Sequence, residues 1–273
     1  MPVRDGTELL VRRWTAVGEP WASILLVHGL AEHSGRYEHV GRQLAAAGLE
    51  VEAYDQRGFG GSSGRRAYVD RWSQNHDDLE QCLAAVRSAA GGRPVILFGH
   101  SLGGLIALGY VLAEPARPLP DLLVLSAPAL ESTIPPWKRL MARVLGTVVP
   151  TLEIKNELDG SILSRDPSVG ERYVEDPLNQ HATTTRFGAL AIAEQAMVRR
   201  GLSRLSIPTL VYHGEDDHLV PTGASAPLAD VPGVVRRTYP GLRHESHNEP
   251  DGPAVLGDVI AWLREAVGSA ARG

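Results

Sequence analysis

The chain has 273 residues, a formal net charge of −5, 43% hydrophobic and 22% charged residues. This length allows one large α/β domain with an insertion or two small domains, and the ordinary composition excludes a disordered or fibrous chain. The acidic balance provides no broad basic surface, so we expect no nucleic-acid partner.

The N-terminal residues 1–8 lack the apolar core of a signal peptide, and no apolar run approaches the roughly 18 residues needed to span a bilayer. The single cysteine, Cys82, cannot form an internal disulfide, which fits a reducing compartment. It shares a helical face with Leu79, Leu83 and Val86, so we expect it to be buried. The sequence therefore predicts a cytoplasmic or peripherally membrane-associated protein.

Strands and helices alternate along the first half of the chain. A short apolar run at 23–27 predicts a buried strand, and a helical pattern follows over 37–47 until Gly48. A second strand is predicted at 50–54, and a capped helix from Ser73 to about residue 90. This alternation favours a mostly parallel sheet with helices on both faces.

The most informative stretch is residues 94–104, where an apolar β run ends in Gly-x-Ser-x-Gly at 99–103 and a helical pattern begins at once. This context is what a nucleophile elbow requires, since a sharp turn from strand to helix exposes a serine hydroxyl above the sheet. Ser101 is the candidate nucleophile. The following helix, expected from Leu102 to about residue 114, would direct backbone N–H groups at the site, with that of Leu102 as an oxyanion donor.

Another buried strand is predicted at 122–126, and then the rhythm changes. Residues 129–205 contain helical pieces, prolines and turns but no clear strand, which predicts an inserted helical cap. The strand pattern returns at 209–212 and 234–239, and an amphipathic helix ends the chain. We therefore expect a core made of 1–128 and 206–273, with 129–205 as the cap.

A serine hydroxyl needs a base to take its proton and a carboxylate to orient that base. Two late strands end in loops that offer both groups. Asp217 follows the strand at 209–212, and His244 follows the strand at 234–239. They give the chain order Ser, Asp, His, although periodicity alone leaves Asp216 as an alternative to Asp217.

Other motifs that suggest a cofactor fail on their spacing. His244 and His247 are spaced His-x-x-His, whereas the zinc helix motif needs histidines at i and i+4. The glycine-rich segment 58–64 lacks the spacing of a dinucleotide loop and predicts a flexible turn. We expect no metal and no organic cofactor.

Several strings spread over almost the whole chain resemble one family, the monoacylglycerol lipases of the α/β-hydrolase superfamily, particularly the bacterial branch. The most selective are His-Gly-x-x-Glu-His-Ser-x-Arg-Tyr at 28–37 and Asp-Pro-Leu at 176–178. The remaining strings are Asp-Gln-Arg-Gly-Phe-Gly-Gly-Ser at 55–62, Gly-His-Ser-Leu-Gly-Gly at 99–104, Leu-Ser-Arg-Asp-Pro at 163–167, His-Gly-Glu-Asp-Asp at 213–217 and Tyr-Pro-Gly-Leu-Arg-His-Glu at 239–245.

The resemblance implies an α/β-hydrolase fold with Ser101 as nucleophile, Asp217 as triad acid and His244 as general base. It further implies oxyanion donors at the backbone N–H groups of Leu30 and Leu102. Ala31 departs from the family, which usually has glycine there, so its methyl group is expected to tighten the oxyanion loop.

The family's cap admits a long acyl chain, and the glycerol head lies nearer the triad. The resemblance therefore places Arg36 and His247 as substrate-binding neighbours of the product exit. An apolar stripe at helical spacing agrees with a lipid substrate, because it could line an acyl tunnel or dock on a membrane; packing on the hydrolase core is the alternative. The stripe comprises Trp137, Leu140, Met141, Val144, Leu145 and Val148.

The sequence thus predicts a serine esterase that hydrolyses monoacylglycerol to fatty acid and glycerol through an acyl-enzyme. A lysophospholipase or broad carboxylesterase with the same machinery is the alternative within the enzyme class. A ligand receptor that has kept the hydrolase fold is a third hypothesis, which the presence of all three triad residues disfavours.

Overall fold

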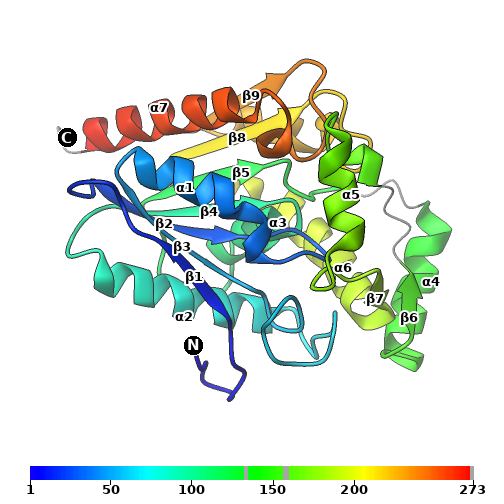
Figure 1. Cartoon of the computed structure of the whole chain (residues 1–273). Helices are drawn as coiled ribbons and strands as arrows, with labels where there is room; N and C mark the ends of the chain where they lie inside the picture. Colours follow the sequence, from blue (N-terminus) through cyan, green and yellow to red (C-terminus); the bar gives the residue numbers. More distant parts are fainter. Residues whose placement is uncertain (132–134, 156–159, 271–273) are drawn as a thin grey trace.

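A seven-stranded sheet forms the centre of the protein in the computed structural model, which describes residues 1–131, 135–155 and 160–270 (Figure 1). The strand order is β1-β3-β2-β4-β5-β8-β9, and all neighbouring pairs are parallel except β1 with β3. The mostly parallel sheet predicted from the sequence is confirmed. The strands are β1 (Val11–Trp14), β2 (Ala22–Val27), β3 (Leu49–Tyr54), β4 (Val95–His100), β5 (Leu122–Ser126), β8 (Thr209–Gly214) and β9 (Val234–Tyr239).

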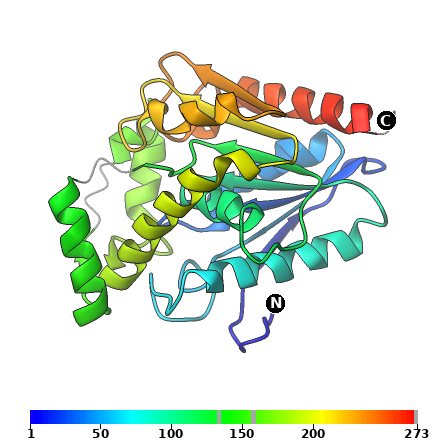
Figure 2. The same cartoon turned by 180° about the vertical axis from the view of Figure 1, so that it is seen from behind.

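Helices cover both faces of the sheet and so bury its central strands on both sides. Along β2, Leu25 packs in the core beneath helices α2 (Ser73–Ala89) and α3 (Leu102–Val111). The next residue, Leu26, packs in the opposite core beneath α1 (Glu38–Ala46) and α7 (Gly252–Ala270). Figures 1 and 2 show α2 and α7 on opposite sides of the sheet.

The boundaries of the N-terminal elements differ in part from those predicted. The edge strand β1 was not predicted, since its sequence Val-Arg-Arg-Trp has no apolar run. The helix predicted at 37–47 is found as α1, which begins at Glu38 and ends at Ala46, and the 3₁₀ turn η1 (Ser34–Tyr37) that precedes it was not predicted. Cys82 is fully buried on α2, as predicted.

The segment between β5 and β8 gathers at one end of the sheet (Figures 1 and 2). The expectation that it lacks strands is wrong, because β6 pairs antiparallel with β7. Each of the two strands has only three residues and no apolar run, which explains why no strand was predicted here. The segment contains α4 (Pro136–Val148), β6 (Glu153–Lys155), η2 (Gly160–Ile162), α5 (Pro167–Glu175), β7 (Ala182–Thr184), α6 (Thr185–Gly201) and η3 (Leu202–Arg204).

Hydrogen bonds fix this segment over the carboxyl ends of the parallel strands. The backbone N–H of Gln180 donates to the carbonyl of Ala31, just after β2, at 2.9 Å. The N–H of Glu245, after β9, donates to the carbonyl of Leu163 at 2.8 Å.

Two 3₁₀ elements complete the core, η4 (Thr222–Asp230) and η5 (Ser246–Asn248). None of the helices in the described ranges has the length and apolarity needed to cross a membrane.

Gly103, in the first turn of α3, sits against the end of β2 and has no room for a side chain. A Cβ there would lie 2.1 Å from the carbonyl oxygen of Val27 and 2.5 Å from that of His28. We expect Gly103→Ala to lower the free energy of unfolding by about 1–3 kcal/mol. The added methyl group would clash with backbone atoms at the end of β2, which cannot move aside as a flexible side chain would. Urea denaturation measures this change.

The matched control is Gly257→Ala on the exposed side of α7, where a Cβ meets nothing within 4 Å. There we expect stabilisation by about 0.5–1 kcal/mol, because alanine restricts the unfolded chain more than glycine does. Equal effects of the two substitutions would show that the contact between α3 and β2 is not tight.

Candidate active site

Ser101 occupies a strained turn between β4 and α3. Its backbone angles are φ 50° and ψ −114°, a conformation that L-residues rarely adopt. The turn is held by its neighbours: the N–H of Ser101 donates to the carbonyl of Ser126 at 2.9 Å, and its own carbonyl accepts from the N–H of Ala129 at 3.0 Å. Such strain is typical of a nucleophile elbow, where the surrounding structure fixes the position of the serine.

Asp217 and His244 are brought together from the ends of β8 and β9. The Nδ1 atom of His244 lies 2.7 Å from Oδ2 of Asp217, and both side chains are buried. A carboxylate can only accept here, so Nδ1 carries the proton and Nε2 is left as the basic atom of the ring. Asp216, the alternative left open by the sequence, has an exposed side chain.

A second histidine, His213, also holds Asp217. Its Nε2 atom lies 3.0 Å from Oδ2 of Asp217 and 2.9 Å from the carbonyl oxygen of Val220. Both partners are acceptors, so this nitrogen carries the proton and donates. No role was predicted for His213 from the sequence, although its position at the end of a buried strand next to an acidic turn was the available signal.

The Asp217 carboxylate is kept ionised by its surroundings. Burial raises its pKa, but the hydrogen bonds from His213 and His244 and the charge of His244 hold the pKa well below its usual range. The backbone N–H groups of Leu219 and Val220 also donate to Oδ1 at 2.8 and 2.9 Å. A permanently charged acceptor therefore faces His244 at neutral pH.

A cavity of about 310 Å³ contains both Ser101 and His244 in its wall. This volume is at the lower end of the range for small-molecule sites. Its apolar wall is formed by residues of the segment between β5 and β8, Ala129, Leu163, Ala191 and Ile192, and by residues outside that segment, Leu30, Leu102, Leu105, Leu219 and Val220. Its polar part consists mainly of Glu32, Arg36, Tyr173 and Glu245, so the cavity suits an amphiphilic ligand.

Arg36 is clamped between two carboxylates at the polar part of the cavity. Its guanidinium donates to both oxygens of Glu245, at 2.7 and 2.8 Å, and to Glu32. Burial disfavours the charge on Arg36, yet the two glutamates raise its pKa well above the ordinary value. The same pairing outweighs the burial of Glu245 and keeps the pKa of that carboxyl well below normal. Arg36 is thus held rigidly as a cation beside the general-base candidate.

His247 is placed behind the cavity rather than in its wall. Its ring stacks on Tyr37 with centroids 5.1 Å apart and meets His100 edge-on at 4.8 Å. Burial and the neighbouring His100 lower the pKa of His247 well below its ordinary value. Burial, with the charge of His244, lowers the pKa of His100 to about 3. Both rings therefore stay neutral and do not compete with His244 for a proton.

The two histidines considered for a zinc motif, and Glu245 between them, have other partners. His244 faces Asp217, Glu245 is paired with Arg36, and His247 packs against aromatic rings. Over residues 1–131, 135–155 and 160–270, no group of three or more His, Cys, Asp or Glu side chains could hold a metal ion.

The two residues expected to supply oxyanion donors both line the cavity. Leu102 is the first residue of α3, so its N–H has no partner one turn earlier in the helix. Leu30 lies in the loop after β2, next to Ala31. Ala31 has φ 64°, a left-handed conformation that explains the preference for glycine at this position. Its carbonyl is fixed by Gln180 from the segment above the sheet.

Comparison with known proteins places this site in a family. A model of the family described as "Serine aminopeptidase, S33" matches residues 18–251. The monoacylglycerol lipase of Mycolicibacterium smegmatis is 36% identical over 94% of this chain and 93% of that protein. The monoglyceride lipase of Homo sapiens is 33% identical over 97% of this chain and 90% of that protein.

Solved structures agree with the sequence relatives. The crystal structure of Paleococcus ferrophilus monoacylglycerol lipase matches with a TM-score of 0.85 and 30% identity, covering 95% of this chain and 99% of that one. The fold class expected from the sequence is confirmed. This chain belongs to the monoacylglycerol lipase family of the α/β hydrolases.

Proposed function

We propose that the protein hydrolyses the ester bond of monoacylglycerol to a fatty acid and glycerol. The observation that carries this proposal is that His244, which pairs with Asp217, lines the same cavity as the strained Ser101. An apolar wall for an acyl chain and a polar part for a small alcohol occur in that one cavity. The lipase names of the relatives support the same substrate class.

In the proposed mechanism, Nε2 of His244 takes the proton of the Ser101 hydroxyl as the oxygen attacks the ester carbonyl. Asp217 orients the ring and stabilises the imidazolium that forms. The N–H groups of Leu30 and Leu102 bind the oxyanion of the tetrahedral intermediate. His244 then gives its proton to the departing glycerol oxygen. Water repeats the sequence on the acyl-enzyme and releases the fatty acid.

We propose that Arg36 lies on the glycerol side of the cavity and that His247 supports His100, which lines the cavity. Arg36 and its two glutamates form the polar part of the cavity wall. His247 is not among the residues that line the cavity and packs behind His100. We therefore expect His247 to act on the substrate only through its neighbours.

We propose that residues 129–205 form a cap over a core of 1–128 and 206–273, and that α4 contacts lipid surfaces. Gly146 of α4 packs against Ala189 of α6. The opposite face of α4 exposes Trp137, Met141, Val144 and Val148. The alternative, that the whole apolar stripe is covered by the hydrolase core, does not fit this exposure. Such an apolar helix face is typical of reversible membrane contact.

Ser101→Ala tests the catalytic proposal. Without the nucleophile, kcat for glycerol release from monoacylglycerol should fall by about 10⁴-fold or more, as in other enzymes that lose a triad serine. The melting temperature of the variant should match that of the unchanged protein, since only a hydroxyl is removed. Near-normal turnover of Ser101→Ala would refute the assignment.

Val148→Glu tests the contact of α4 with lipid. Val148 is 72% exposed on α4, and Val17, with 70% exposure in the loop before β2, provides a matched control. Sedimentation with phosphatidylcholine vesicles should show at least about tenfold weaker binding for Val148→Glu, because an apolar contact is replaced by a charge. Val17→Glu should bind as the unchanged protein does, and equal loss in both variants would contradict the proposal.

A further inference from the structure

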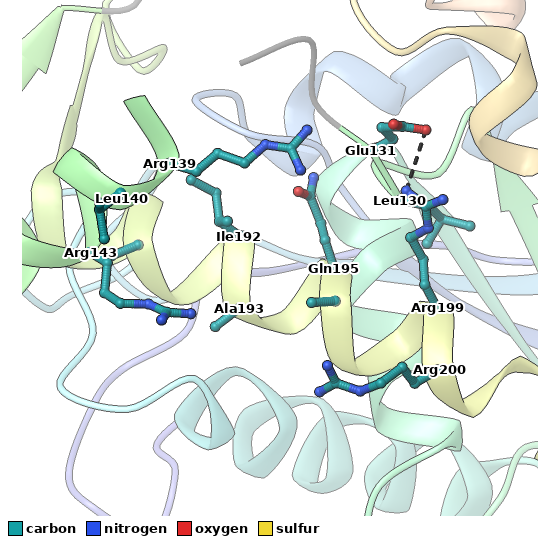
Figure 3. A pocket seen from close by; sticks show the side chains of 12 residues that line it. Leu130, Glu131, Arg139, Leu140, Arg143, Ile192, Ala193, Gln195, Arg199 and Arg200 are labelled. Atoms are coloured by element: carbon teal, nitrogen blue, oxygen red, sulfur yellow. Dashed lines mark ion pairs between the residues drawn. The ribbon is translucent and has the colours of Figure 1, made fainter. Parts of the chain in front are cut away.

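A second cavity, of about 610 Å³, lies between α4 and α6 (Figure 3). The two cavities share Glu131, Ile192 and Gln195 in their walls, so they are neighbours along α6. We call the second cavity the arginine groove. Its lining residues are Leu130, Glu131, Arg139, Leu140, Arg143, Ala189, Ile192, Ala193, Gln195, Ala196, Arg199 and Arg200.

Positive charge is concentrated in this groove. Arg139 and Arg143 come from α4, Arg199 and Arg200 from α6, and among the described residues Glu131 is the single acidic one in the wall. Arg199 pairs with Glu131 at 3.4 Å. Among the described residues, no carboxylate forms an ion pair with Arg143 or Arg200. The groove is therefore cationic in a chain whose net charge is −5.

Apolar side chains lie between the arginines. Along α6, Ala189, Ile192, Ala193 and Ala196 follow the i, i+3, i+4, i+7 spacing of one helix face, and Leu140 contributes from α4. Figure 3 shows Arg143 and Arg200 on one side of α6 and Arg139 and Arg199 on the other. An apolar strip between cationic edges fits a ligand with a hydrocarbon chain and an anionic head.

The proposed reaction makes such a ligand. Hydrolysis turns a neutral ester into a carboxylic acid that loses its proton at neutral pH, so the product acquires a negative charge inside the active-site cavity. An unpaired ion is costly in an apolar cavity, and the fixed carboxylates of Glu32 and Glu245 lie at the cavity's polar part. The arginines of the neighbouring groove can form charge-assisted hydrogen bonds with the product's carboxylate.

We propose that the arginine groove is a binding site for the long-chain fatty-acid anion, which it receives from the neighbouring active-site cavity. This inference rests on the proposed function. Arg143 and Arg200 would hold the carboxylate, and the apolar strip of α6 would hold part of the chain. The groove has the volume of a small-molecule site, whereas a bilayer would meet the outer face of α4 described above.

The test is the binding of laurate, below its micelle concentration, measured by titration calorimetry on the full chain. The double variant Arg143→Gln/Arg200→Gln should bind laurate at least tenfold more weakly, because both proposed carboxylate partners are gone. The control Arg13→Gln/Arg42→Gln removes two exposed arginines of β1 and α1, outside the groove, and should leave the affinity for laurate unchanged. Unchanged laurate affinity in the groove variant would overturn the proposal.

Two further ligands distinguish recognition of the carboxylate from binding of the alkyl chain and from binding of a membrane surface. Dodecanol has the same chain length and a neutral head, so its affinity should be the same in the groove variant and the unchanged protein. If the groove variant loses binding to phosphatidylglycerol vesicles while keeping its laurate affinity, the arginines serve a membrane surface and the proposal is wrong. A loss of affinity for dodecanol equal to that for laurate would also contradict it, since that would indicate general damage to the groove.

The variant Arg143→Lys/Arg200→Lys guards against misfolding. Lysine keeps the charge, so this variant should retain most of the laurate affinity that the glutamine variant loses, with the same melting temperature. Failure of the unchanged protein to hydrolyse monoacylglycerol would refute the proposed function separately, because laurate binding is measured without turnover.

Discussion

The hydrogen bond between Nδ1 of His244 and Oδ2 of Asp217 is the contact on which the site depends. It joins the loops after β8 and β9 and leaves Nε2 of His244 as the basic atom. Asp217 can play this part because His213 and two backbone N–H groups share its charge and keep it ionised although it is buried. The sheet makes the contact possible, since the parallel strands β8 and β9 have their carboxyl ends at the same edge.

Charge is distributed unevenly around the two neighbouring cavities. At the polar part of the active-site cavity, Arg36 is neutralised by Glu32 and Glu245, so a small neutral alcohol meets hydrogen-bonding groups without an excess of positive charge. In the arginine groove the balance is reversed, with four arginines and one glutamate among the described lining residues. This difference in charge favours glycerol, as a product of the proposed reaction, at the first site and the fatty-acid anion at the second.

The sequence predicted those parts of the structure that depend on local patterns. Buried strands such as β4 and the turn at Ser101 were predictable, because an apolar run followed by Gly-x-Ser-x-Gly has few other structural outcomes. The strands β6 and β7 were not predictable, since each has three residues and is stabilised by pairing with the other. The role of His213 and the placement of His247 depend on contacts between distant segments, and no periodicity encodes them.

In the proposed mechanism His244, fixed by Asp217, activates Ser101 as the nucleophile. Covalent labelling with a fluorophosphonate, followed by peptide mass spectrometry, tests this activation. We expect the label on Ser101, and we expect the labelling rate to fall by about 100-fold or more in His244→Ala, because a general base is lost. A label on another residue, or labelling of Ser101 at an unchanged rate without His244, would refute this role of His244.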